Sequence, residues 1–119
     1  MQQICLVLSV LAGGGEDARD FMRELEESRK QEYAQSEERI GITKEAWYLA
    51  PLPAGEILVA YMEIDDFGTA LGLFSQSHDD FDMWFKRRLA DVTGIDLNDP
   101  PEITLPELLS SYSAVSTAL

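Results

Sequence analysis

The stretch EILVAYMEI, residues 56–64, decides the fold, because it is typical of a β-strand with two apolar faces. Successive side chains of a strand point to opposite sides of the sheet. Both sides are apolar here, with Ile57, Val59 and Tyr61 on one side and Leu58, Ala60, Met62 and Ile64 on the other. Residues 3–11 (QICLVLSVL) show the same two-sided pattern. The sheet that these strands build should therefore be covered on both faces.

The segments on either side of this strand predict an α+β domain. The alternation of apolar positions, Gly/Pro turns and capping residues predicts strands over 3–11, 43–49 and 56–64, a helix over 16–39, and helices over 66–74 and 79–92. The short connection between the second and third strands predicts a hairpin. One helix over 16–39 would be ~36 Å long, whereas an eight-residue strand spans only ~27 Å. Its polar second half should therefore overhang the sheet or bend away from it.

The order of the elements predicts a ferredoxin-like, split βαβ arrangement with all helices on one face of an antiparallel sheet. A chain of 119 residues fits a single domain. We expect its core to span about residues 3–105 and a C-terminal tail to follow over 106–119. Ile103–Leu105 is compatible with a short fourth strand, which Pro106 would end.

The second sheet face needs a cover, because large exposed apolar patches are uncommon on soluble monomers. No further helix remains in the sequence to provide it. The same face of a second chain, related by a two-fold axis, is the simplest cover, and a homodimer is the prediction. The alternative is that the C-terminal tail folds under the sheet.

The composition excludes several classes of partner and site. The formal net charge of −13 repels phosphate backbones and anionic membrane surfaces, so neither nucleic acid nor a membrane is an expected partner. No stretch approaches the ~20 apolar residues of a membrane span. The apolar N-terminal run lacks the preceding Lys or Arg of a signal peptide, so we expect a cytoplasmic protein. One cysteine and one histidine argue against zinc, and no metal or cofactor is expected.

At this level the chain resembles the dimeric α+β barrel superfamily, in which the sheets of two ferredoxin-like domains face each other. Residues 41–47 (GITKEAW) and 77–85 (SHDDFDMWF) are similar to segments of small bacterial proteins with no assigned activity. The superfamily includes cofactor-free monooxygenases, haem enzymes and muconolactone-isomerase-like proteins, so the resemblance implies a fold and not an activity. Its haem-binding members place their axial histidine elsewhere in the chain, so haem is not expected.

Five residues are candidates for ligand binding: Tyr33, Trp47, Tyr48, Tyr61 and His78. Trp47 and Tyr48 are adjacent on a strand and must point to opposite faces, one into the helix-covered core and one between the paired sheets. Tyr61 lies on the neighbouring strand, and Tyr33 lies on the overhanging helix. These aromatic side chains either fill the interface as core or form the wall of a pocket for a flat apolar ligand. His78 is the chain's one histidine, a residue type that often acts as a general base, although it lies in a polar loop.

Acidic residues at two places are possible functional sites. Asp79, Asp80 and Asp82 stand where a helix begins, and capping with a favourable helix dipole explains them better than a cation site does. Glu63 is the best carboxylate near Tyr61 to act as a general base, but a solvent-exposed strand end explains it better.

Two functions follow as hypotheses. The first is a homodimeric α+β barrel protein that binds a small apolar molecule. The second is a cofactor-independent monooxygenase-like enzyme, in which Tyr61 or His78 would polarise an aromatic substrate held between sheet and helices. The enzyme hypothesis requires an open pocket with at least one polar group on its wall.

Overall fold

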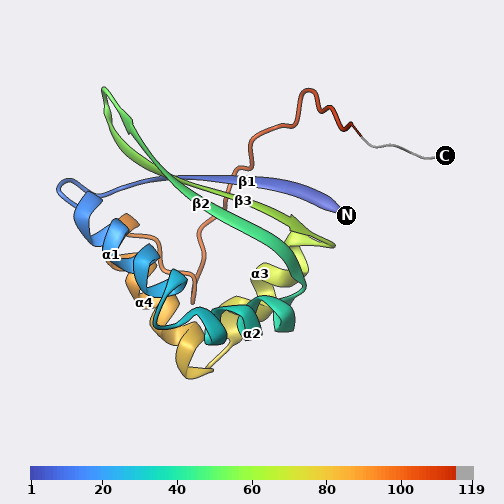
Figure 1. Cartoon of the computed structure of the whole chain (residues 1–119), viewed down its shortest axis with the longest axis horizontal. Helices are drawn as coiled ribbons and strands as arrows, with labels where there is room; N and C mark the ends of the chain where they lie inside the picture. The colour runs from blue at the N-terminus through green and yellow to red at the C-terminus, as the bar shows by residue number, and fades with distance from the viewer. Residues whose placement is uncertain (115–119) are drawn as a thin grey trace.

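The computed structural model describes residues 1–114 and shows an α+β fold with one antiparallel sheet. Within these residues there are three strands and four helices: β1 (Gln2–Ser9), α1 (Gly15–Glu26), α2 (Lys30–Ile40), β2 (Ile42–Leu52), β3 (Gly55–Ile64), α3 (Phe67–Gln76) and α4 (Asp80–Thr93). All four helices lie on the same side of the sheet (Figure 1). The predicted class, the three strands and the hairpin between β2 and β3 are confirmed.

The strand with two apolar faces, β3, lies at the centre of the sheet in the order β1-β3-β2. The register places Leu6 beside Ala60 and Ala60 beside Trp47, so these three side chains share the face that the helices cover. On the opposite face, Tyr48 lies beside Val59, which in turn lies beside Val7. The hairpin closes at Gly55, whose φ of 137° is a conformation that residues with a side chain rarely adopt.

The core forms where the covered face of the sheet meets α1 and α4. Phe21 is fully buried and packs edge-on against Phe85 and Trp84, with ring centroids 5.0 and 5.5 Å apart. Leu58 contributes from β3 and Leu89 from α4. Edge-to-face aromatic pairs add ~0.5–1.5 kcal/mol each to the gain from apolar burial, so this cluster is the rigid part of the molecule.

The expected single helix over 16–39 is wrong, because the chain breaks into α1 and α2 at residues 27–29. The apolar stripe of α1 ends at Leu25, and a straight continuation would carry the polar second half past the end of the sheet. The break turns α2 across the end of the helix layer (Figure 1). Tyr33 and Ser36 are thereby brought toward the core instead of overhanging it.

The possible fourth strand over Ile103–Leu105 does not form. Pro100, Pro101 and Pro106 surround this segment, and a proline has no N–H group to donate to a strand ladder. The tail instead runs as irregular chain from the helix layer past the sheet and away from it (Figure 1). Within residues 1–114 the outer edge of β1 has no partner strand.

The face of the sheet opposite the helices, called the open face from here on, stays uncovered by the described part of the tail. Val7 is 51% exposed and Tyr48 is 61% exposed on this face, although both are large and apolar. The tail leaves Leu109 and Tyr112 more exposed still. The alternative in which the tail folds under the sheet is therefore not seen for residues 106–114, and residues 115–119 lie outside the described part of the chain.

Candidate ligand-binding site

A cavity of about 70 Å³ lies between the covered face of the sheet and helices α2, α3 and α4. A single water needs ~10–15 Å³ of such space, so the cavity is large enough for several waters or for one small molecule. Most of its wall is apolar, as shown by Leu6, Met62, Ile64, Ala70, Phe74 and Leu97. A cavity with an apolar wall attracts apolar molecules in preference to water.

Five polar side chains line this cavity: Tyr33, Ser36 and Glu37 from α2, and Glu45 and Trp47 from β2. The four other than Ser36 are called the polar end from here on. Tyr33 and Glu37 are four residues apart and share one face of their helix. Glu45 and Trp47 are two residues apart and share one face of their strand. The end of α2 packs against β2, and this brings the two pairs together.

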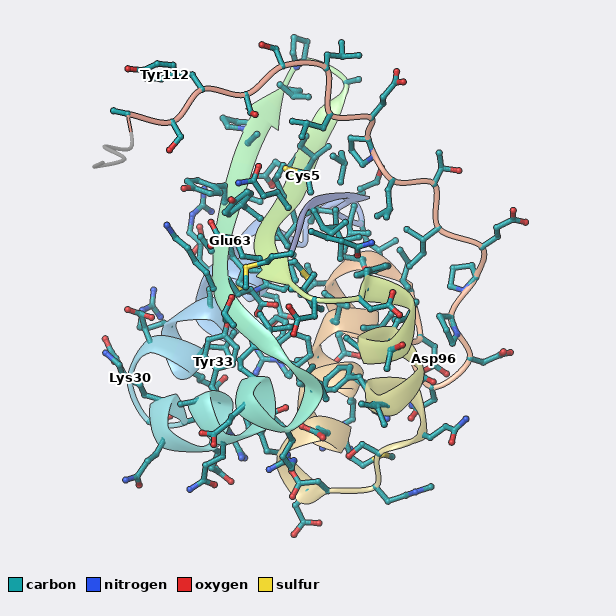
Figure 2. All side chains as sticks on the ribbon, turned by 90° about the vertical axis from the view of Figure 1, so that its right-hand side faces the viewer. Cys5, Lys30, Tyr33, Glu63, Asp96 and Tyr112 are labelled. Atoms are coloured by element: carbon teal, nitrogen blue, oxygen red, sulfur yellow. The ribbon has the colours of Figure 1, made fainter. Side chains whose placement is uncertain are left out.

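Hydrogen bonds converge on a single carboxylate oxygen of the polar end. The Trp47 indole Nε1–H donates to Oε1 of Glu45 at 3.0 Å, and the Tyr33 hydroxyl donates a short hydrogen bond to the same atom. In Figure 2, Tyr33 lies between α2 and the strands, whereas Lys30 lies on the outer side of the same helix. The two strongest donors of the polar end are thus already used within the protein.

The carboxyl group of Glu37 has fewer hydrogen-bond partners than that of Glu45. Oε1 of Glu37 is buried and has no hydrogen-bond partner among the described residues. Burial, and then the neighbouring Glu45, raise the pKa of Glu37 to about 10. Burial and the same carboxylate also raise the pKa of Tyr33. At neutral pH Glu37 is therefore protonated, because burial and a neighbouring acid both disfavour its charged form.

A buried carboxylate, that of Asp82, holds α2 against α4 beside the cavity. Asp82 is only 1% exposed, and its carboxylate accepts hydrogen bonds from Ser36 Oγ at 2.5 Å and Ser77 Oγ at 2.6 Å. Arg39 also donates to it at 3.2 Å. Asp79 caps α4 by accepting from two backbone N–H groups, as the sequence predicts. Asp82 is different from a simple capping acid, because its bonds reach α2 and thereby position Tyr33 and Glu37.

The end of α3 is held by a buried cation. Lys86 has no exposed surface, and its Nζ donates to the backbone carbonyls of Phe74 and Ser77 at 2.9 Å and of Ser75 at 3.3 Å. Burial lowers the pKa of this amine. The carbonyls at a helix C-terminus have no partner within the helix, and Lys86 supplies one. It thereby fixes Phe74, which forms part of the cavity wall.

The structure separates the five candidate residues into three places. Tyr33 and Trp47 meet at the polar end. Tyr48 and Tyr61 lie on the open face, since their partners across the sheet are Val59 and Cys5. His78 is exposed in the loop between α3 and α4. The strand alternation thus decides that Trp47 joins the helix side and Tyr48 the open face, and the cavity brings together only the first pair.

Two residues of the polar end, Glu37 and Glu45, are not among the sequence candidates. The signals that could have found them are the spacing of Glu37 from Tyr33 and of Glu45 from Trp47. Both spacings occur by chance on most polar surfaces. Glu63, which the sequence marked beside Tyr61, accepts a hydrogen bond from the Tyr61 hydroxyl at 2.7 Å on the open face.

Comparisons with known proteins add no family, since no family model, no curated protein and no solved structure matches the chain. Among residues 1–114, no group of three or more His, Cys, Asp or Glu side chains is arranged to hold a metal ion. None of the helices in this part of the chain has the length and apolar character needed to cross a membrane.

Proposed function

We propose that this protein binds a small, largely apolar molecule in the cavity between the sheet and helices α2, α3 and α4. The observation that carries the proposal is an apolar cavity with polar groups gathered at one end only. Ligand sites commonly combine an apolar wall with a few polar groups that orient the ligand.

The volume of the cavity limits the ligand. About 70 Å³ is well below the ~300–1,000 Å³ of sites that hold drug-sized ligands. The ligand is therefore a short alkyl chain or a single ring. The tail contributes to the enclosure, because Ile103 lies on the cavity wall.

The two tryptophans of the chain allow a direct test. Trp47 Nε1 lies at the polar end, whereas Trp84 is buried in the core and does not line the cavity. Titration with benzene or hexan-1-ol, followed by ¹H–¹⁵N NMR, should shift the indole signal of Trp47 more than that of Trp84. Equal shifts of both signals, or no saturable shift, would contradict the proposal.

A variant that fills the cavity provides the control. Ala70 is buried on α3 and lines the cavity, so Ala70→Leu should occupy the space and abolish the Trp47 response. Ala34 is exposed on α2, so Ala34→Leu makes the same chemical change outside the cavity and should leave the titration unaltered. Unchanged binding in Ala70→Leu would place the ligand elsewhere.

We also propose that the domain is a ferredoxin-like unit without its fourth strand and works as a homodimeric α+β barrel. The support is the open face, where Val7 and Tyr48 are more than half exposed next to Val59 and Tyr61. A second copy is the proposed occupant, because an apolar face of this kind is complementary to itself about a two-fold axis. A standard interface buries ~800 Å² on each partner, an area that one face of a three-stranded sheet and its flanking tail can supply.

The alternative function, a cofactor-independent monooxygenase-like enzyme, has weaker support. Its requirement for a pocket with a polar wall is met by the polar end. However, the two groups assigned to the reaction, Tyr61 and His78, lie on the open face and in an exposed loop. A space of about 70 Å³ also suits one ring better than the fused rings of a large aromatic substrate. We therefore favour binding over catalysis.

A further inference from the structure

We propose that the ligand is a hydrophobic amine, whose protonated amino group binds between Glu37 and Glu45 while its apolar part fills the cavity. This inference rests on the proposed binding function and specifies the chemistry of the ligand. Three features of the polar end support it: an unused acceptor, the absence of free donors, and the balance of charge.

The unused acceptor is Oε1 of Glu37. This atom is buried, it belongs to a residue that lines the cavity, and it has no hydrogen-bond partner within residues 1–114. A buried polar atom without a partner destabilises the folded protein. A ligand N–H group placed there would remove this penalty, whereas an alkane would leave it in place.

The donors of the polar end are already engaged. The Tyr33 hydroxyl and the Trp47 indole N–H both donate to Glu45 Oε1, and the nearby Ser36 hydroxyl donates to Asp82. The carboxyl O–H of protonated Glu37 is engaged as well, in a side-chain hydrogen bond with Glu45 that helps to raise the pKa of Glu37. No Lys, Arg or His side chain in the described part of the chain lines the cavity. A carboxylate or phosphate ligand would therefore find no donor and would face two acids.

The balance of charge favours a cation. The titratable groups that face Glu37 are Tyr33 on its own helix, Glu45 on β2 and Asp82 on α4, and the sequence of α3 contains no titratable side chain. Arg39, a positive charge on the same helix, is bound to Asp79 and Asp82. An ammonium group would place a positive charge between two acids that no cation on the cavity wall accompanies. It would also allow Glu37 to ionise, because an opposite charge within a few ångströms favours the charged form of an acid.

Amine binding should release a proton. The protonated carboxyl group of Glu37 loses its proton to solvent, and the resulting carboxylate pairs with the ammonium group, whose own proton count does not change. The affinity for an amine should therefore increase with pH between about 6 and 8.5, by up to about tenfold per unit. The affinity for an alcohol with the same chain should not change over this range.

A matched series of probes tests the inference. Hexylamine, hexan-1-ol and hexanoate share one alkyl chain and differ only in the polar group. Calorimetry at pH 7.5, in two buffers of different ionisation enthalpy, measures both affinity and proton release. We expect hexylamine to bind about tenfold more tightly than hexan-1-ol, hexanoate to bind least, and amine binding to release close to one proton.

Two variants separate this role of Glu37 from a structural one. Glu37→Gln keeps the shape but cannot ionise, so the preference for the amine should fall at least about fivefold and its pH dependence should disappear, while hexan-1-ol still binds. Glu38→Gln removes the same charge at an exposed neighbouring position and should behave like the wild type.

The outcomes distinguish the two proposals. If none of the three probes binds the wild-type protein, the proposed binding function itself fails. If hexan-1-ol binds but hexylamine is not preferred, or if Glu37→Gln retains the preference and its pH dependence, only the amine inference is overturned. Tighter binding of hexanoate would overturn it as well.

Discussion

The hydroxyl group of Tyr33 donates a hydrogen bond to Oε1 of Glu45 and so joins α2 to β2. The same oxygen accepts the indole N–H of Trp47, so three aromatic or acidic groups from two elements are locked at one end of the cavity. This arrangement depends on the break between α1 and α2, which turns Tyr33 toward the sheet. Predictions about stability, pH dependence and assembly follow from this arrangement, from its neighbours and from the open face.

Removal of the Tyr33 hydroxyl should weaken the contact between α2 and β2. Tyr33→Phe keeps the ring but leaves Glu45 with one donor fewer, so the free energy of unfolding should fall by about 1–2 kcal/mol. Urea denaturation followed by tryptophan fluorescence measures it. Tyr48→Phe is the control, because Tyr48 is exposed on the open face and loses no bond found in the structure. A Tyr33→Phe protein as stable as this control would mean that the bond contributes nothing.

The raised pKa of Glu37 predicts an unusual dependence of stability on pH. Its pKa is about 10 in the folded protein and close to the ordinary 4.5 in the unfolded chain. Between these values the unfolded chain loses a proton that the folded protein keeps, so this group makes folding less stable as pH rises through that window.

Glu37→Gln should remove this effect. At pH 8.5 the variant should be more stable than the wild type by about 1–3 kcal/mol, and the difference should shrink toward pH 4.5. Thermal unfolding across this pH range measures the difference between the two proteins, with Glu38→Gln as the matched control. A constant difference at all pH values would show that Glu37 does not titrate in this way.

Lys86 should be essential for holding the C-terminal end of α3 in place. In Lys86→Met the new side chain matches the length of lysine and its apolar stem. It has no amino group, so it cannot donate to the carbonyls of Phe74, Ser75 and Ser77. One buried and two half-buried acceptors would lose their partner, and we expect the protein to be destabilised by about 2–4 kcal/mol. Arg87→Met changes the neighbouring, exposed cation and should alter stability by less than about 0.5 kcal/mol.

Local loss of order would be the more specific sign of this role of Lys86. Hydrogen exchange should accelerate over residues 72–79 in Lys86→Met, where the carbonyl partners lie. Unchanged exchange in that segment, in a protein of wild-type stability, would contradict the assignment.

The open face should control assembly. Light scattering should give twice the chain mass of 13.3 kDa for the wild type at micromolar concentration. Val59→Asp or Tyr61→Asp places a charge in the middle of the proposed interface, and each variant should dissociate the dimer or unfold the protein. Leu73→Asp changes an exposed apolar residue on α3 and should leave the dimer intact. A wild-type protein of 13.3 kDa, or unchanged assembly in both open-face variants, would refute the dimer.

Much of the fold could be predicted from local patterns. The two-sided apolar strand 56–64, the hairpin and the cap at Asp79 all depend on side-chain alternation or on contacts within one turn, and all three are seen in the structure. The break between α1 and α2 could not be predicted, because no Pro or Gly marks residues 27–29. The break satisfies a tertiary requirement, which is to keep Tyr33 and Ser36 next to the rest of the fold.

The candidate site also depends partly on local sequence patterns and partly on tertiary packing. The sequence by itself determined that this protein has a sheet with two apolar faces, helices for only one of them, and the aromatic residues Tyr33 and Trp47 in its elements. Only the tertiary structure decided that these two residues meet with Glu37 and Glu45 around one cavity. The reason is physical: alternation and helical periodicity set the direction of a side chain relative to its own element. The distance between Tyr33 on α2 and Glu45 on β2, and the burial that raises the pKa of Glu37, exist only after the elements have packed together.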